Sequence, residues 1–332
     1  MHRRTKATIL VIVIILLLLA GAIYLRKKAP PEAARLLPES DGIVYVNLGP
    51  IRAATHFDKH PVAYAPEYQH FIDETGIDPE RDLDEAAFAL HRMDNPLGAN
   101  GAVAFSEVFV GRFDGKRLTR FLERVARSKE SYAGHDVYSI PSDTRVDRVA
   151  ILGYDMVAVS NTPTAEQIHS ILDRYRTAAL PFSGSTLLSQ HYQEVPLLSL
   201  AWGIGKIGLP LGTNGGIKLL GFTVPFSFDT TFIASLMWRG NVHLRVEEIA
   251  PNEAAASLSA SSIQTFVDLF RAAENNLPGG MTNPQLRDLL NSTSVEHHKN
   301  RAILTATVPT SLIQKIVSTP QDLGGLPNPA EK

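Results

Sequence analysis

The run from Gly111 to Arg117, GRFDGKR, is the closest approach in this sequence to a phosphate-binding loop. It lies between an expected strand and an expected helix, as such a loop should. However, three residues separate its glycines where the motif needs four, and Arg117 replaces the serine or threonine that would hold Mg²⁺. Asp114 would also place a negative charge against the phosphates. We therefore interpret Asp114 as a helix cap in a tight turn and expect no nucleotide site and no cofactor.

Two pairs of histidines have spacings that invite a metal-site interpretation. His56 and His60 are four residues apart, which would place both imidazoles on one helical face. Pro61 opposes this, because a proline biases the preceding residue away from helical geometry. His297 and His298 are adjacent in an expected strand, where neighbouring side chains point to opposite faces. We therefore expect surface or structural histidines and no metal site.

The sequence shows no recognisable nucleophile for hydrolysis. Ser185, in FSGST, has the most exposed-looking serine context, but it lacks the flanking glycines of a nucleophile elbow. The clustered carboxylates Asp82, Asp84 and Glu85 fit a solvated turn. The chain has no cysteine, which excludes a cysteine nucleophile, thiolate metal ligands, disulfides and a lipoprotein anchor. Catalytic residues therefore remain unknown from the sequence.

The strands and helices that would position any functional side chains follow a recurring pattern. An apolar strand followed by a short amphipathic helix occurs twice. The first copy has a strand at 103–112, a capping aspartate and a helix with apolar residues at i, i+3, i+4 and i+7. The second has strands at 149–152 and 156–160, with Thr162 as the cap and Pro163 at the first helical position. A helix with one apolar stripe must bury it, and the strands supply the sheet for that.

The remaining periodic segments extend the same pattern along the chain. Strands are expected at 42–48, 294–298 and 301–308, and helices around 68–72 and over 253–274.

Short connections between the expected strands decide the fold class. Only Arg239-Gly240-Asn241 separates the strands 231–238 and 242–249, which predicts an antiparallel hairpin. The fold class is therefore α+β, not a doubly wound parallel sheet. We expect two related modules of antiparallel sheet with amphipathic helices packed on it, at 38–180 and 181–318. A Pro/Gly-rich flexible tail, 319–332, follows them.

The N-terminal region, 1–28, reads as a membrane anchor. Residues 7–25 form 19 consecutive uncharged positions. At ~1.5 Å per residue such a helix spans roughly 28 Å, about the thickness of a bilayer's hydrocarbon core. A cleaved signal peptide is the alternative, but its apolar core is typically only ~7–15 residues long. Residues 29–37 then read as a linker.

The charge distribution bears on orientation and partners. Three Lys or Arg residues flank the apolar run on each side, so the positive-inside rule gives a tie. The free amino terminus adds a charge before the run, which favours a body outside the cytoplasm, on the periplasmic side of the inner membrane. Without these six cations the rest of the chain has 26 basic against 34 acidic residues, a net charge of −8. Such a body disfavours nucleic-acid binding.

The glycine-rich stretch 203–228, GIGKIGLPLGTNGGIKLLGFTVPFSF, has no regular period. Its large apolar residues, among them Leu219, Leu220 and Phe222, admit two interpretations. They are buried in the seam between the modules, or they form an exposed flap that touches the membrane or a partner.

Four runs of this sequence resemble phrases of an uncharacterised bacterial family of membrane-anchored proteins. They are LPESDGIVYV from Leu37, ETGIDP from Glu74, DTTFIA from Asp229 and RAILTATVP from Arg301. This resemblance implies a membrane anchor and a repeated α+β extracytoplasmic domain. It implies no catalytic residues.

The sequence thus leads to a membrane-tethered extracytoplasmic protein whose domain binds a partner, such as an envelope protein, or supports the envelope, without enzymatic activity. The alternative is an envelope hydrolase or transferase with a site built from dispersed residues, because catalytic groups are recognised by geometry rather than by sequence position. A deep polar cleft that holds a nucleophile, a base and oxyanion donors within reach would favour the alternative.

Overall fold

The computed structural model describes residues 29–55, 66–142, 144–177, 184–206, 212–213, 216–219, 222–225, 230–276 and 284–309. The expected anchor 7–25, the pair His56 and His60, and the tail 319–332 lie outside these residues. Among the helices that the structure does describe, none is long and apolar enough to cross a bilayer. The anchor therefore stays a prediction.

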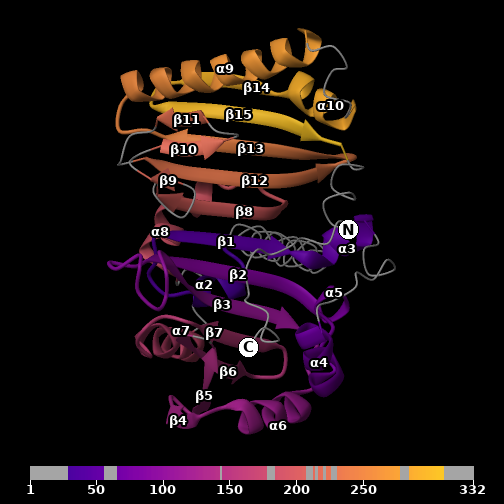
Figure 1. Cartoon of the computed structure of the whole chain (residues 1–332), viewed down its shortest axis with the longest axis vertical. Helices are drawn as coiled ribbons and strands as arrows, with labels where there is room; N and C mark the ends of the chain where they lie inside the picture. Colours follow the sequence, from indigo (N-terminus) through magenta and orange to yellow (C-terminus); the bar gives the residue numbers. More distant parts are fainter. Residues whose placement is uncertain are drawn as a thin grey trace, which may run out of the picture.

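One twelve-stranded sheet organises the body (Figure 1), and every pair of neighbouring strands is antiparallel. In spatial order the strands are β14 (Ser294–His298), β15 (Arg301–Val308), β13 (Asn241–Ile249), β12 (Thr231–Arg239), β8 (Ser199–Lys206), β1 (Gly42–Asn47), β2 (Leu83–Arg92), β3 (Val103–Gly111), β7 (Met156–Ser160), β6 (Arg145–Leu152), β5 (His135–Ser142) and β4 (Ser128–Tyr132). The predicted α+β class with antiparallel sheet is confirmed.

Helices and a second, three-stranded sheet complete the described part. The helices are α2 (Glu32–Leu36), α3 (Leu48–Thr55), α4 (Pro66–Thr75), α5 (Pro79–Asp82), α6 (Gly115–Val125), α7 (Glu166–Arg176), α8 (Thr186–His191), the 3₁₀ turn η2 (Tyr192–Glu194), α9 (Glu253–Asn276) and α10 (Pro284–Ser292). The small sheet has β9 (Gly212–Thr213), β10 (Gly216–Leu219) and β11 (Phe222–Pro225).

The chain order of the strands divides the large sheet into two halves. Strands β1 to β7 form one half, β8 and β12 to β15 form the other, and the β1–β8 pair joins them. The expected modules 38–180 and 181–318 thus supply separate halves of one continuous sheet. Whether the modules are related stays a prediction.

Side chains alternate between the two faces of the sheet, and one face, which we call the covered face, carries the main core. Ile43 on β1 pairs with Ala89 on β2 and Ile204 on β8, and all three side chains are buried. Helix α7 packs here through Ile168, Ile171 and Leu172, each 0% exposed. Their spacing is the i, i+3, i+4 stripe that the sequence predicts.

Helix α2 corrects the expected linker 29–37. Ala33, Ala34, Leu36 and Leu37 are at most 1% exposed and belong to the same core as β1 and α7. A proline- and alanine-rich run reads as a spacer, but small side chains also allow a short helix to pack closely on a sheet. The body therefore begins at about Glu32.

Asp114 caps α6 as predicted. Its Oδ1 accepts hydrogen bonds from the backbone N–H groups of Lys116 at 3.0 Å and Arg117 at 3.1 Å. The glycine at position 111 is required by packing and not by a phosphate, because a Cβ there would collide with the carbonyl oxygen of Asp82. The predicted hairpin is present too, with Gly240 at φ +81° in its turn.

Candidate functional site

The second face of the sheet has an apolar middle, which we call the trough. Its central row runs from Ala234 on β12 through Gly203 on β8, Val44 on β1 and Phe88 on β2 to Glu107 on β3. The rows above and below it share this face by the alternation of side chains along each strand. The trough residues are Phe232, Ala234, Leu236, Ala201, Gly203, Gly205, Val44, Val46, Ala86, Phe88, Leu90, Phe105, Glu107 and Phe109.

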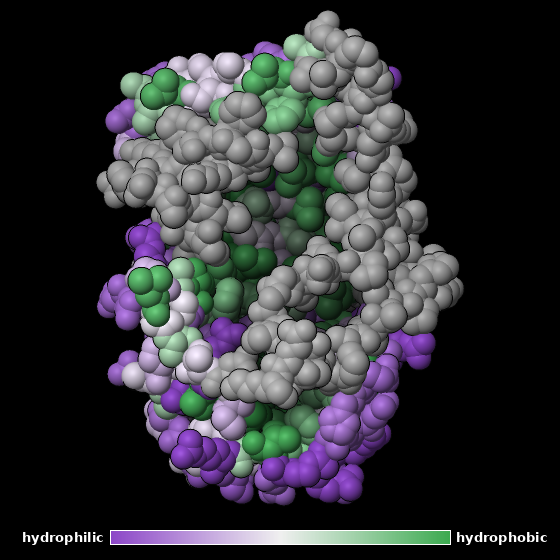
Figure 2. Space-filling model, viewed as in Figure 1, coloured by the Kyte–Doolittle hydropathy of each residue, from purple (hydrophilic) through white to green (hydrophobic). Residues whose placement is uncertain are grey.

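Helices cover the two ends of this face and so form the walls of the trough. At the β5–β7 end, Leu118 and Leu122 of α6 pack with Tyr138, Val149 and Val157 of the sheet. At the other end, Ser259 of α9 donates a hydrogen bond from Oγ to Oε1 of Glu248 on β13, at 3.0 Å. Between these walls Figure 2 shows hydrophobic residues gathered in a hollow. Val44, at the centre, is 37% exposed.

The chemistry of the trough is that of a contact surface. The rings of Phe88 and Phe109 meet edge to face with centroids 5.8 Å apart. Glu107 is the one charged residue of the set. Burial raises its pKa to about 7, with a further rise from Asp147 and an opposing effect of Arg145. Near neutral pH a large fraction of this carboxyl is therefore uncharged, which suits its apolar surroundings.

Two of the three predicted contact residues, Leu219 and Phe222, lie in the small sheet. Leu219 pairs with Phe222 across the β10–β11 hairpin, and Leu220 lies outside the described residues. Strand β11 contacts α9, one wall of the trough. A contact role for Leu219, Leu220 and Phe222 stays a prediction.

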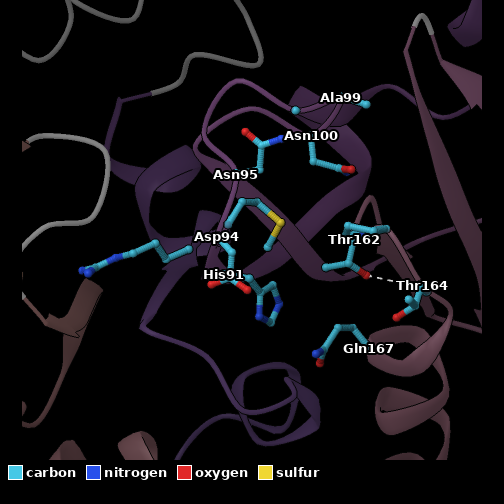
Figure 3. A pocket seen from close by; sticks show the side chains of 12 residues that line it. His91, Asp94, Asn95, Ala99, Asn100, Thr162, Thr164 and Gln167 are labelled. Carbon is cyan, nitrogen blue, oxygen red and sulfur yellow. Dashed lines mark hydrogen bonds between the residues drawn. The ribbon is translucent and has the colours of Figure 1, made fainter.

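A polar pocket lies where β2 ends, between the β2–β3 connection and the segment that joins β7 to α7 (Figure 3). It encloses about 430 Å³ and is lined by residues 91–95, 98–100, 162–164 and Gln167. His91 and Asp94 lie on one side, and Thr162, Thr164 and Gln167 on the other. Hydrogen bonds hold its rim, among them Thr144 Oγ1 to the carbonyl oxygen of Ala99 at 3.0 Å.

A chain of hydroxyls runs inward from this pocket across three strands. Nε2 of His91 lies 2.9 Å from Oγ of Ser106, which lies 3.2 Å from Oγ of Ser160. Ser160 Oγ lies 2.9 Å from Oγ1 of Thr162, which donates to the carbonyl oxygen of Thr164 at 3.1 Å. All four side chains in this relay are at most 7% exposed.

The direction of the protons in the relay follows from its last bond. A carbonyl oxygen only accepts, so Thr162 gives its single proton to Thr164 and must accept from Ser160. Ser160 in turn accepts from Ser106, and Ser106 accepts from His91. Nε2 of His91 therefore carries the proton and Nδ1 carries the lone pair. Burial lowers the pKa of His91, against an opposing effect of Asp41, so the ring is neutral near pH 7.

This polarity bears on catalysis by a serine. A general base must accept the nucleophile's proton, but His91 donates to Ser106. Ser106 is also 0% exposed, so a substrate in the pocket would not meet its hydroxyl. The His91–Ser106 pair is thus arranged as a structural relay.

Thr162 corrects a second expectation. It does not cap α7, which begins at Glu166 after Ala165 with no side-chain cap bond. Its hydroxyl is engaged in the relay instead, and Pro163 lies before the helix rather than in its first turn. The sequence shows hydroxyl residues after β7 but cannot show which partner they choose.

Other residues singled out in the sequence have structural roles. Ser185, which the sequence suggested to be exposed, is fully buried at 0% exposure. Its Oγ caps α8 by accepting a hydrogen bond from the N–H of Leu188 at 3.3 Å. Asp82 accepts from the N–H of Asp78 at 2.8 Å, and Asp84 pairs with Arg52 at 3.2 Å.

Comparison with known proteins does not assign this chain to a family. No protein-family model matches this chain, and no curated protein matches it. Among solved structures, "Structure of crystal form IV of TP0453" is similar with a TM-score of 0.48 and 12% identity, covering 86% of this chain and 96% of that one. "Structure of crystal form III of TP0453" gives 0.49 and 11%, covering 87% and 98%.

Proposed function

We propose that this protein is a membrane-tethered extracytoplasmic binding domain without enzymatic activity, and that the trough receives an apolar helix of a partner envelope protein. The observation that carries the proposal is the apolar middle of the sheet face between the walls formed by α6 and α9. A face of this kind, left without a partner, would be costly for a protein in water.

A helix is the occupant that fits the dimensions of the trough. Its five strands, at about 4.8 Å each, are roughly 24 Å across, which matches about 16 residues of α-helix. Helices α6 and α9 already pack on this face, so a helix between them would continue the same layer. Gly203, in the central row of the trough, has no side chain, so a helix could approach the backbone of β8 closely there. Recognition would follow the helix-in-groove mode, with apolar anchors at i, i+3, i+4 and i+7.

The tether belongs to the same proposal. The apolar residues 7–25 would hold the body on the periplasmic side of the inner membrane. Because α2 begins at Glu32 and is buried in the core, only a short connection separates the body from the anchor. A trough close to the bilayer would meet the juxtamembrane helices of other envelope proteins. A reporter active only outside the cytoplasm should therefore work when fused after Lys332.

No observation favours the hydrolase or transferase alternative. The base–hydroxyl pair that comes nearest to it, His91 and Ser106, is polarised in the wrong direction and buried.

Site-specific photocross-linking in native membranes tests the proposal. A cross-linker at Val44, in the full chain, should capture one protein through a peptide with an amphipathic helical pattern. The same cross-linker at Tyr154, which is 96% exposed in a loop far along the sequence, is the matched control. Val46→Asp should abolish the Val44 product, because a charge in the trough opposes apolar contact.

Three outcomes would refute it. They are capture of lipid alone at Val44, the same product at Tyr154, or a Val44 product that survives Val46→Asp while the variant remains folded by circular dichroism.

A further inference from the structure

The polar pocket at the end of β2 presents hydrogen-bond acceptors that no protein donor uses. The relay assigns the proton of His91 to Nε2, so Nδ1 is an acceptor, and no other described residue bonds to it. Within the described part of the chain, no donor reaches the carboxylate of Asp94 either. Both groups lie on the same side of the pocket (Figure 3).

We infer that this pocket binds a small ligand through an ammonium group, held by Nδ1 of His91 and the carboxylate of Asp94. An ammonium has three N–H donors and a positive charge, so it can satisfy both acceptors at once and gains a charge-assisted bond to Asp94. An anion would meet a lone pair and a negative charge. A single hydroxyl has one proton and satisfies one acceptor.

Burial keeps the His91 imidazole neutral, so that Nδ1 can accept a hydrogen bond. His91 is 7% exposed, and burial lowers its pKa below the ordinary value of about 6.5. The charged groups around it are Asp41, which opposes the shift, and Asp94 and Arg92, which line the pocket. Above that pKa Nδ1 accepts. Below it the ring gains a proton at Nδ1, becomes cationic and repels an ammonium.

The relay residues act as positioning residues in this site. Ser106, Ser160 and Thr162 do not reach the ligand, but they hold the proton on Nε2. Without the relay both neutral tautomers become populated, and the share with Nδ1 as an acceptor falls.

Ethanolamine and ethylene glycol form a matched pair of probes, because they differ only in the replacement of the ammonium by a hydroxyl. The full chain in detergent is titrated with each, and the ¹⁵N shifts of the His91 ring are followed by NMR. Ethanolamine should bind at least about tenfold more tightly than ethylene glycol at pH 7.5, the size expected for a bond to a charged group. Its binding should weaken as the pH falls through the lowered pKa of His91.

Two variants separate the two acceptors from a general charge effect. Asp94→Asn should weaken ethanolamine binding at least about tenfold. Asp155→Asn, which removes an exposed carboxylate from the β6–β7 turn, should leave it unchanged. Thr162→Val keeps the shape of the side chain but breaks the relay. It should shift the His91 ¹⁵N signals toward a mixture of tautomers and weaken binding.

The inference is wrong if ethylene glycol binds as tightly as ethanolamine, if neither probe moves the His91 signals, or if Asp155→Asn weakens binding as much as Asp94→Asn. It is also wrong if the wild-type ring is found with its proton on Nδ1. None of these results depends on the trough, so the proposed function is tested separately.

Discussion

The two faces of the large sheet are closed in different ways. On the covered face, α2, α7 and α8 meet β1 to β8 in one continuous core, and Ile43, Leu172 and Leu188 are at most 1% exposed. On the other face, the described helices α6 and α9 cover the two ends. The side chain next to Ile43 in the sequence, Val44, is 37% exposed there.

If the proposed function is correct, this difference separates the residues that stabilise the fold from those that bind a partner. The covered face contains the side chains whose removal leaves a cavity, so its residues determine the free energy of unfolding. The trough is equally apolar, but Val44 in its middle is 37% exposed. Two adjacent residues on one strand therefore have different consequences when changed.

Ile43→Ala and Val44→Ala test this contrast most directly. Ile43→Ala should lower the free energy of unfolding by about 3 kcal/mol, because it opens a cavity in the core. Val44→Ala should cost less than about 1 kcal/mol, because the site is partly exposed. Denaturant unfolding by circular dichroism measures both. Equal losses would mean that the trough is closed within the chain itself.

The second prediction concerns a polar contact on the covered face. Arg301 donates to Glu194 at 2.9 Å through both Nη atoms and also pairs with Glu247, which is 4% exposed. Arg301→Met should cost about 2 kcal/mol, because it takes the only bidentate donor from Glu194 and leaves the buried carboxylate of Glu247 with Arg245 as its remaining charged partner among the described residues. Arg176→Met removes an exposed arginine paired with Asp173 and is the control, with a change below about 0.5 kcal/mol.

The same network sets a pH dependence. Arg301 lowers the pKa of Glu194 below its ordinary value. A carboxyl with a lowered folded pKa stabilises the fold above its unfolded pKa of about 4.3, and that stability is lost as the pH falls through the folded value. The difference in stability between wild type and Arg301→Met should therefore shrink at acidic pH. A difference that does not change down to pH 3 would contradict the assignment.

The third prediction concerns the α9 wall of the trough. Glu248 is 2% exposed, and its Oε2 has no hydrogen-bond partner among the residues that the structure describes. Burial raises its pKa to about 7. A raised folded pKa means that stability falls as the pH rises from about 4.3 to about 7. Glu248→Gln should therefore be more stable than wild type at pH 8 by about 1–2 kcal/mol, and equal to it near pH 4. A Glu248→Gln variant that is less stable at pH 8 would show that the charged form is favoured there.

The smallest effect on stability is expected inside the trough. Glu107→Gln should change the melting temperature little at pH 6, because a large fraction of the carboxyl is already uncharged there. The same variant should retain the cross-linked product at Val44. A loss of the product would mean that the partner needs the carboxylate and does not bind through apolar contact alone.

The sequence by itself determined the local elements of this protein. The period of the apolar residues placed α4, α6, α7 and α9, and Asp114 caps α6 as its spacing predicts, whereas the predicted cap of α7 was wrong. Short turns such as the one at Gly240 determined antiparallel pairing, because so few residues cannot cross a sheet. The absence of cysteine excluded thiolate chemistry before any fold was known.

The sequence of β1 also indicates a second apolar face of the sheet. Periodicity alone, however, does not distinguish a partly exposed apolar face from a buried core. Val44 and Val46 alternate with Ile43 and Tyr45, so β1 is apolar on both faces. Such a strand must be covered on both sides. Which of these apolar rows is buried and which is partly exposed depends on where the helices pack on each face.

Only the tertiary structure decided the long-range partners. His91, Ser106, Ser160 and Thr162 come from β2, β3 and the end of β7, and nothing in their spacing shows that they form one relay. Residues Glu32–Leu36 of the expected linker form a helix in the core for the same reason, because burial depends on surfaces built by residues far away in the chain. Local propensity is a property of neighbouring residues, whereas a site is a property of pairing between distant strands.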